Sequence, residues 1–345
     1  METLVPYIDS SPILHNPFAL RERMDRDGFF FFKRLLPRDT VLDLRERLLS
    51  ICARHGWLDA NAPLMEGKIN AAAAEAIPDF CGVGVDQPGY ADVYRTEAFH
   101  RLAQHPNIMG LMERLAGEPV LAHPRNIARL MFPTQKSAPT PPHQDHIHIQ
   151  GTKAVYTCWI PLGDTTESLG GLQVLGGTHG VGILPVRRSS GAGGVGVVLD
   201  GLKEEWSHGD FEAGDALVFH SLTVHRSVPN QFRDRLRLSV DYRYQPVSLP
   251  IEKGSLLPHC GVLPSWDDVY AGWTDEALQY YWKKHEFQFQ EYDLALFNEA
   301  SSPMMGGGAM GGQMGGMSGP MMGGGQMGGG MSGPMGGMSG PTGQN

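Results

Sequence analysis

The feature that most constrains the fold is a series of short apolar segments between residues 143 and 245, separated by turns rich in Gly, Pro and Asp. The segments cover residues 154–160, 172–175, 194–199, 215–220 and 236–244. Segments of this length, rich in β-branched and aromatic residues, are typical of strands. Several short strands at this spacing predict two facing antiparallel sheets or a barrel.

The region before these strands has a different pattern. Apolar residues recur every three or four positions over 37–56 and again over 97–116, which predicts two amphipathic helices. Four phenylalanines at 29–32 follow Gly28 and predict a buried strand, and a last helix is expected over 275–285. We therefore expect a mainly β fold with flanking helices. Its centre is a double-stranded β-helix of the jelly-roll or cupin-like type, at about 119–250, behind an N-terminal helical region.

The composition changes abruptly near residue 302. Residues 303–345 are dominated by Met and Gly and contain no charged side chain. Such a segment has too little apolar variety to build a packed core, so we expect a disordered tail. The sequence thus predicts a single domain over residues 1–302, and the whole acidic balance belongs to it.

Charge and cysteine content restrict the partners and the compartment. The net charge of −9 argues against nucleic acid as the main partner, and no apolar run is long enough for a membrane span. The four cysteines are Cys52, Cys81, Cys158 and Cys260, and no two of them form a Cys-x-x-Cys pair. We therefore expect unpaired thiols in a reducing compartment. The first residues lack a basic segment followed by an apolar one, so the cytoplasm is the expected location. No oligomeric state is predicted.

A metal site is indicated by His143 and Asp145. Residues two apart on a strand point to the same face, so this pair could chelate one ion. His208 and Asp210 have the same spacing, but only 15 residues separate Asp210 from His225. The 80 residues between Asp145 and His225 allow several strands to wind around the fold and return. Two histidines and one carboxylate that leave positions open are typical of a non-haem iron(II) site.

Other histidines leave alternatives open. His220, which ends the apolar run 216–219, competes for the third ligand position with His225, which follows a short turn. We prefer His225, because the strand that carries Arg235 would then pair next to it. His146 and His148 could join His143 in a cupin-like metal site, although we interpret them as structural or pocket-lining. A metal-free jelly-roll that only binds a ligand is a further alternative.

A charged pattern follows the last histidine. Arg235, Arg237 and Ser239 fall on one face of the strand expected there, and a buried arginine needs an anionic partner. A guanidinium can grip a carboxylate through two hydrogen bonds, which suits a dicarboxylate co-substrate. Arg125 and Arg129, on an earlier strand, could contact an acidic substrate group, but we interpret them as solvated charges.

Together these residues resemble the phytanoyl-CoA dioxygenase family of iron(II)/2-oxoglutarate oxygenases. The resemblance covers about 100 residues, from His143 and Asp145 to Ser239, and also includes Asp27-Gly28 near the N-terminus. It includes two motifs between these ends, the glycine-rich segment 170–179 and the pair Gly214-Asp215.

The resemblance implies a role for each site residue. His143, Asp145 and His225 would be the iron ligands, and Arg235 would bind the distal carboxylate of 2-oxoglutarate, with Arg237 as a rival. Ser227 and Trp159 would line the co-substrate pocket.

The reaction implied is hydroxylation, or a related oxidation, of an unactivated C–H bond in a small organic molecule. O2 would be consumed, and succinate and CO2 released. Relatives that halogenate lack the carboxylate ligand, and Asp145 is present. The chain has no basic cluster suited to coenzyme A. The loop 133–142 and the insertion 185–210 are candidate lids.

Overall fold

Short strands that alternate between two apolar environments build the central part of the protein. The structure is a computed structural model, and it describes residues 2–133 and 138–298. The strands are β1 (Thr3–Pro6), β2 (Phe29–Phe32), β3 (Val120–Ala122), β4 (Ile127–Met131), β5 (Tyr156–Pro161), β6 (Leu172–Leu175), β7 (Val186–Arg188), β8 (Val195–Val197), β9 (Glu205–His208), β10 (Ala216–His220), β11 (Val224–Ser227), β12 (Arg237–Pro246), β13 (Ile251–Glu252) and β14 (Phe289–Gln290).

Two sheets face each other. The major sheet has the order β2-β10-β5-β12-β3, with β4 also paired to β12, and the minor sheet has the order β1-β9-β6-β11. Except for β1 and β9, which run parallel, the pairs within these two sheets are antiparallel. Apolar side chains fill the space between the sheets; they are Phe29, Phe31, Trp159, Leu172, Val174, Phe211, Leu217 and Phe219. This arrangement confirms the predicted double-stranded β-helix.

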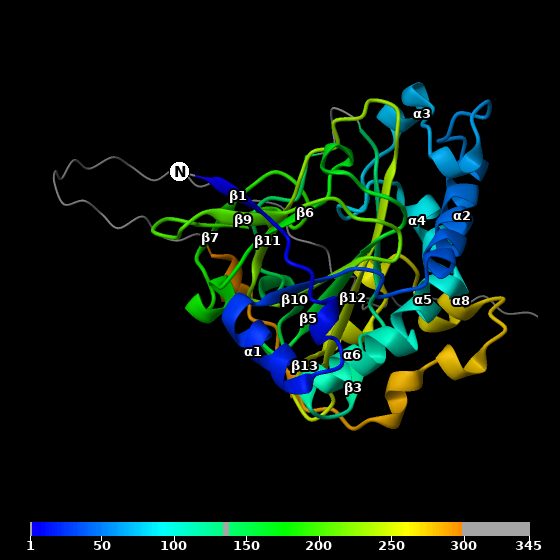
Figure 1. Ribbon diagram of the computed structural model, residues 1–345. Coiled ribbons are helices and arrows are strands. Elements are labelled where there is room, and N and C mark those ends of the chain that lie inside the picture. Colours follow the sequence, from blue (N-terminus) through cyan, green and yellow to red (C-terminus); the bar gives the residue numbers. More distant parts are fainter. Residues whose placement is uncertain (1, 134–137, 299–345) are drawn as a thin grey trace, which may run out of the picture. The chain divides into compact units, whose positions relative to one another are not determined.

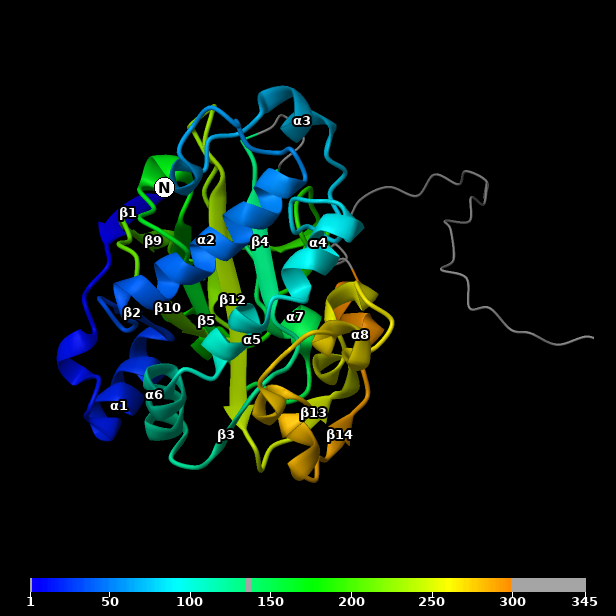
Figure 2. The same ribbon diagram turned by 90° about the vertical axis from the view of Figure 1, so that its right-hand side faces the viewer.

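Helices cover the outer face of the major sheet. Figure 1 shows this sheet between the minor sheet and the helices, and in Figure 2 α2 passes across β12 and β4. The helices are α1 (Pro17–Asp27), α2 (Arg38–Arg54), α3 (Ala71–Ala76), α4 (Gln87–Tyr94), α5 (Glu97–Ala103), α6 (Pro106–Ala116), α7 (His146–Ile149) and α8 (Trp266–Tyr270). The largest apolar cluster lies between them and the sheet, with Leu44, Leu48, Tyr242 and Tyr244 among its members.

The turn from α1 into β2 explains the Asp27-Gly28 motif. Gly28 ends α1 with a φ of 75°, a left-handed conformation that glycine adopts without strain. A Cβ at this position would lie 2.4 Å from Nδ1 of His179 and 2.7 Å from Oγ1 of Thr223. A larger residue would therefore push β2 away from the segment that leads into β11.

Two sequence-based expectations on helices need correction. The expected helix over 97–116 is two helices, because Pro106 has no N–H and holds His105 in an extended conformation at ψ 132°. The expected helix over 275–285 is replaced by two short 3-10 helices, η7 (Glu276–Leu278) and η8 (Tyr281–Lys284), with Tyr280 at a φ of 50° between them. The expected disordered tail, 303–345, lies outside the described residues.

The cysteine expectation is wrong for two of the four residues. Cys81 and Cys260 form a disulfide, while Cys52 and Cys158 are free and buried. The two bonded cysteines are 179 positions apart, so their spacing in the sequence carried no sign that two loops meet. In the part of the chain that the structure describes, no helix is long and apolar enough to cross a membrane.

Candidate metal centre

The backbone brings His143, Asp145 and His225 to one point between the two sheets. His143 and His225 exchange two backbone hydrogen bonds, at 3.0 and 3.1 Å, which join the segment before α7 to β11. Oδ1 of Asp145 lies 3.7 Å from Nε2 of His143 and 3.8 Å from Nε2 of His225. All three side chains are buried, and their ligand atoms lie within 4.8 Å of one another.

The ring orientation of both histidines is determined by the backbone. Nδ1 of His143 lies 2.8 Å from the carbonyl of Pro141, and Nδ1 of His225 lies 3.0 Å from that of Thr223. Because a carbonyl only accepts, each Nδ1 carries the proton and each Nε2 turns a lone pair towards Asp145. Burial, followed by repulsion from His225, lowers the pKa of His143 to about 3. Burial likewise lowers the pKa of His225, so both rings are neutral at neutral pH, as metal ligands must be.

The carboxylate of Asp145 is oriented through its other oxygen. Oδ2 accepts a hydrogen bond from Oγ1 of Thr157 at 2.6 Å and a longer one from Nη2 of Arg243 at 3.4 Å. Burial alone would raise the pKa of Asp145, but Arg243, the two histidines and Thr157 together lower it. Oδ1 therefore remains free and negatively charged beside the two Nε2 atoms. Two neutral imidazoles and one carboxylate fit a divalent iron ion.

A small polar cavity, which we call the inner pocket, adjoins the three candidate ligands. Its walls include them together with Arg129, Thr140, Thr157, Trp159, Leu172, Phe219, Ser227, Arg237, Asp241 and Arg243. Three of these, Arg237, Asp241 and Arg243, are alternate residues of β12. Side chains two apart on a strand share a face, so one face of β12 supplies most of the charge in the inner pocket.

A larger cavity of about 590 Å³, the outer cavity, lies next to the inner pocket and shares Ser227 and Arg237 with it. Apolar and polar groups alternate along its wall, from Met131 and Phe132 on one side to Asn230 and Phe232 on the other. Its size is typical of a site for a small organic ligand.

A model of the phytanoyl-CoA dioxygenase family matches residues 24–235, which is more than half of the chain. The chain belongs to the phytanoyl-CoA dioxygenase family. The members of this family are iron- and 2-oxoglutarate-dependent oxygenases, and this enzyme therefore uses iron, 2-oxoglutarate and O2.

Several relatives resemble this oxygenase over most of their length. It is 29% identical over 260 residues to the 1-deoxypentalenic acid 11-beta-hydroxylase of Streptomyces exfoliatus. The matched segment covers 72% of this chain and 87% of the relative. It is 24% identical over 227 residues to the peroxisomal phytanoyl-CoA dioxygenase of Bos taurus, covering 63% and 66% of the two chains. Among solved structures, it is similar to the non-haem α-ketoglutarate-dependent epimerase SnoN from nogalamycin biosynthesis. That similarity has 23% identity, covers 68% of this chain and 85% of SnoN, and has a TM-score of 0.48.

Arg235 does not lie where the sequence analysis expected it in this oxygenase. The residue precedes β12, its side chain is exposed, and its guanidinium lies 5.5 Å from the ring of Phe232. Its carbonyl accepts a hydrogen bond from Asn230 at 2.8 Å, which makes it part of a turn. Because β12 begins only at Arg237, Arg235 is not on the inward face of the strand. The expectation that Arg235 lies in the pocket is therefore corrected.

Arg237, the alternative to Arg235 for the distal carboxylate of 2-oxoglutarate, lies on the inward face of β12. It is only 3% exposed, it lines both cavities, and its Nη1 donates to Oγ of Ser239 at 2.6 Å. Within the described part of the chain, its Nε has no hydrogen-bond partner. Burial, and then repulsion by Arg129, lowers the pKa of Arg237 to about 10, so the group stays charged at neutral pH. A buried cation of this kind fits a carboxylate ligand.

Ser227 and Trp159 both line the inner pocket, at the places where the sequence analysis put them. The hydroxyl of Ser227 accepts a hydrogen bond from the backbone N–H of Thr140 at 2.6 Å, so it also ties β11 to the loop after residue 137. Trp159 is 1% exposed, packs against Phe211 and lies 6.0 Å from the guanidinium of Arg237. Both residues therefore shape the pocket around Arg237.

The competing histidines are not brought together with the candidate ligands. Among the described residues, only Asp145 and His225 form with His143 a group whose ligand atoms all lie within 4.8 Å of one another. The ring of His148 lies beside that of His143, with 6.4 Å between the ring centroids, but His148 is not part of this group. His220 instead packs beside Tyr156 and His179, and His146 begins α7. The cupin-like cluster is thus not formed.

Several side chains of the inner pocket were not predicted from the sequence, and three of them matter most for the site. Arg129 was interpreted as a solvated charge, but its Nε donates to Asp241 at 3.0 Å inside the pocket. Thr157 and Arg243, which hold Asp145, were not singled out at all. One signal was present: from Arg237 to Gln245, polar residues alternate with Leu, Val and Tyr along a strand that is buried on both faces.

Proposed function

We propose that the enzyme hydroxylates, or otherwise oxidises, an unactivated C–H bond of a small organic molecule that binds in the outer cavity. The observation that carries the proposal is the convergence of two uncharged Nε2 atoms and one carboxylate oxygen beside the buried, incompletely paired Arg237. The hydroxylase activity in the name of the Streptomyces exfoliatus relative supports this reaction type. A single oxygenase domain over residues 1–302 is part of the proposal.

The roles of the side chains follow from their geometry. His143, Asp145 and His225 would hold iron(II), and Arg237, with Ser239 beside it, would bind the distal carboxylate of 2-oxoglutarate. When bound, iron and 2-oxoglutarate supply the oxidising chemistry, in which O2 is consumed and succinate and CO2 are formed. Trp159 limits the movement of Arg237 and helps to exclude water from the inner pocket, which strengthens the charge interactions there.

The matched pair Arg237→Ala and Arg235→Ala tests the co-substrate assignment. Loss of a buried charged hydrogen-bond donor costs about 2–4 kcal/mol, so we expect Arg237→Ala to weaken 2-oxoglutarate binding by about 30-fold or more. Arg235→Ala, in an exposed turn, should change it less than twofold. Binding is measured anaerobically by calorimetry on the protein loaded with Fe(II). Equal effects of the two substitutions would refute the role of Arg237.

Succinate formation tests the class of reaction. The protein with Fe(II), 2-oxoglutarate and O2 should form succinate slowly even without a substrate, and His143→Ala should abolish both iron binding and succinate. Turnover of an identified substrate without 2-oxoglutarate would instead favour the cupin-like alternative. Purified protein that binds no Fe(II) would favour a ligand-binding jelly-roll.

Partners and compartment complete the proposal. A small-molecule substrate suits the outer cavity, and the net charge of −9 disfavours nucleic acid. We retain the cytoplasm as the proposed compartment. Disulfides in that compartment are usually transient, so the Cys81–Cys260 bond is expected to cycle there rather than persist.

A further inference from the structure

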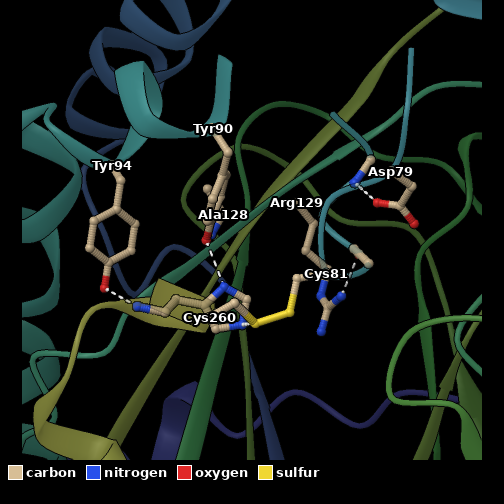
Figure 3. The surroundings of a disulfide bond; sticks show 10 residues. Asp79, Cys81, Tyr90, Tyr94, Ala128, Arg129 and Cys260 are labelled. Carbon is tan, nitrogen blue, oxygen red and sulfur yellow. Dashed lines mark hydrogen bonds between the residues drawn. A yellow bond between two sulfur atoms is a disulfide. The ribbon is translucent and has the colours of Figure 1, made fainter. Parts of the chain in front are cut away.

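The Cys81–Cys260 disulfide joins two segments that flank the inner pocket. Cys81 lies in the loop between α3 and α4, residues 77–86, and Cys260 lies in η6 (His259–Gly261) of the C-terminal region. Figure 3 shows the disulfide between Tyr90 and Arg129, close to β4. Both cysteines are exposed, so small thiols can reach either sulfur.

The chemistry around the two cysteines differs from that around the two free ones. Burial raises the pKa of Cys52 to about 12 and also raises the pKa of Cys158 well above its usual value, which keeps both as unreactive thiols. Cys260, in contrast, has the Nε2 atom of His259 3.5 Å from its sulfur, and the other ring nitrogen of His259 lies 3.2 Å from the hydroxyl of Tyr90. The imidazole is thus held in a position to exchange a proton with Cys260.

One side chain connects the loop 77–86 with the inner pocket. Arg129 donates from Nη1 to the carbonyl of Gly82, next to Cys81, at 2.9 Å. From Nε it donates to Asp241 at 3.0 Å, and both Arg129 and Asp241 line the inner pocket. A displacement of Gly82 therefore removes one of the hydrogen bonds that hold Arg129 in place.

The loop also packs tightly on two other segments. The backbone N–H of Leu130, in β4, donates to the carbonyl of Val83 at 2.8 Å. A Cβ on Gly82 would lie 2.6 Å from that of Ala192, so the loop contacts the segment 189–194. In that segment a Cβ on Gly193 would lie 2.8 Å from the ring of His148, whose own ring packs against His143. Two sets of contacts thus connect the loop 77–86 with the surroundings of the candidate iron ligands.

We propose that Cys81 and Cys260 form a reversible thiol–disulfide site for small intracellular thiols, and that its reduction loosens the loop 77–86 and with it the inner pocket. A thiolate of the reductant attacks one cysteine sulfur, the S–S bond breaks, and a mixed disulfide forms. A second thiol of the reductant then displaces the first. Overall, two thiols are oxidised to one disulfide, the protein disulfide gains two electrons, and the two thiol protons end on Cys81 and Cys260.

The first experiment maps the thiols in the metal-free full chain. Protein purified without reductant should label with maleimide at neither Cys81 nor Cys260, as read by peptide mass spectrometry. After mild treatment with a dithiol, both should label and both should reoxidise with oxidised glutathione, while Cys52 and Cys158 stay unlabelled in either state. Labelling of Cys81 and Cys260 without reduction, or failure of the bond to reduce under native conditions, would overturn the proposal.

The second experiment measures the loosening by hydrogen–deuterium exchange, again without metal. Reduction should raise the exchange rate of the amides at 82–85 and of Leu130 by about tenfold, with α2 as the internal reference. Cys260→Ser should show the faster rate in both redox states, whereas Cys52→Ala should respond as the wild type does. If Cys260→Ser does not fold, the comparison of the oxidised and reduced wild-type protein still tests the loosening. Unchanged exchange after complete reduction would refute the coupling.

The effect on the inner pocket rests on the proposed function and is measured separately. With Fe(II) bound and the reductant removed, the dissociation constant for 2-oxoglutarate should rise at least about threefold on reduction. An equal constant in both states would refute the link to the pocket. Absence of 2-oxoglutarate binding in both states would refute the proposed function and leave the thiol site standing. If the reduced protein instead binds one Zn(II) at Cys81, His259 and Cys260 and recovers slow exchange, the cluster is a metal site and the redox proposal is wrong.

Discussion

Replacement of Thr157 by valine should weaken iron binding without touching a ligand. Valine has nearly the same shape as threonine, so the substitution removes the 2.6 Å hydrogen bond to Oδ2 of Asp145 and little else. The remaining donor to that oxygen, Nη2 of Arg243, is 3.4 Å away and too long to orient the carboxylate by itself. Asp145 would then be free to rotate and to present either oxygen, or neither, between the two histidines.

The expected size of the effect can be estimated in two ways. A hydrogen bond to a charged group contributes about 1.5–3 kcal/mol, which corresponds to a factor of roughly 10–150 in affinity. Removal of a residue that orients a metal ligand typically costs about 10–100-fold in metal affinity. We therefore expect the Fe(II) dissociation constant of Thr157→Val to rise by about 10–100-fold.

The assay is an anaerobic titration with Fe(II), or with Co(II) followed by its visible absorption. Thr157→Ser keeps the hydroxyl and should remain within about threefold of the wild type, while both variants should melt close to the wild-type temperature in the metal-free form. Equal affinities of the valine and wild-type proteins would refute the reasoning, and so would an equal loss in the serine and valine variants.

Two further predictions concern stability. Gly84→Ala should lower the free energy of unfolding by at least about 2 kcal/mol. The φ of Gly84 is 91°, and the new Cβ would lie 1.9 Å from the carbonyl oxygen of Leu130. The free energy is measured by urea unfolding, with Gly180→Ala as the control, because a Cβ on Gly180 meets nothing within 4 Å. Burial lowers the pKa of His123 to about 3, so the folded protein keeps this ring neutral while the unfolded chain takes up a proton below about pH 6.5. Stability from His123 is therefore present above pH 6.5 and is lost as the pH falls towards 3, by about 2 kcal/mol between pH 7 and pH 5. Other buried histidines with a lowered pKa, such as His143 and His100, add to the same slope. Urea unfolding at several pH values should therefore show a steeper slope than His123 alone gives, and His123→Gln should reduce the loss between pH 7 and pH 5 by about 2 kcal/mol.

Local patterns predicted the elements that depend on nearby residues. The apolar spacing in α2 gave the correct element because the helix buries one continuous face. The aromatic run of β2 did so because this strand is buried on both of its faces. The same spacing failed at Pro106, where a missing N–H outweighs a continuous apolar stripe. It also failed at Tyr280, which has a left-handed backbone conformation and whose ring packs against Tyr270 and Trp282.

For the site, spacing predicted that His143, Asp145 and His225 lie together, but it did not predict their surroundings. The long return from Asp145 to His225 indicated that strands must wind around the fold, and the bridge between His143 and His225 shows this return. The choice between Arg235 and Arg237 depended on where β12 begins, and strand ends are the least certain part of a sequence-based assignment. The Cys81–Cys260 bond joins segments with no common pattern, so only the folded chain could reveal it.

Charged and apolar side chains alternate along β12, so the same strand builds both the inner pocket and the apolar core. One face of the strand carries Arg237, Asp241 and Arg243 into the inner pocket, while the opposite face carries Tyr242 and Tyr244 towards the helices. The hydroxyls of these tyrosines donate to carbonyls in α5. A shift of one residue in strand register would exchange the two faces, placing arginines in the apolar layer and tyrosines beside the iron ligands.

A chain with this strand out of register would therefore lose its charge pattern and its core in the same step. Length changes are expected to be tolerated in the exposed turn at 230–235, where the shift can be absorbed before the strand begins, and to abolish folding within 237–245. Quality control that removes unfolded chains would at the same time remove chains with a misassembled oxygenase centre, since no stable fold can carry one.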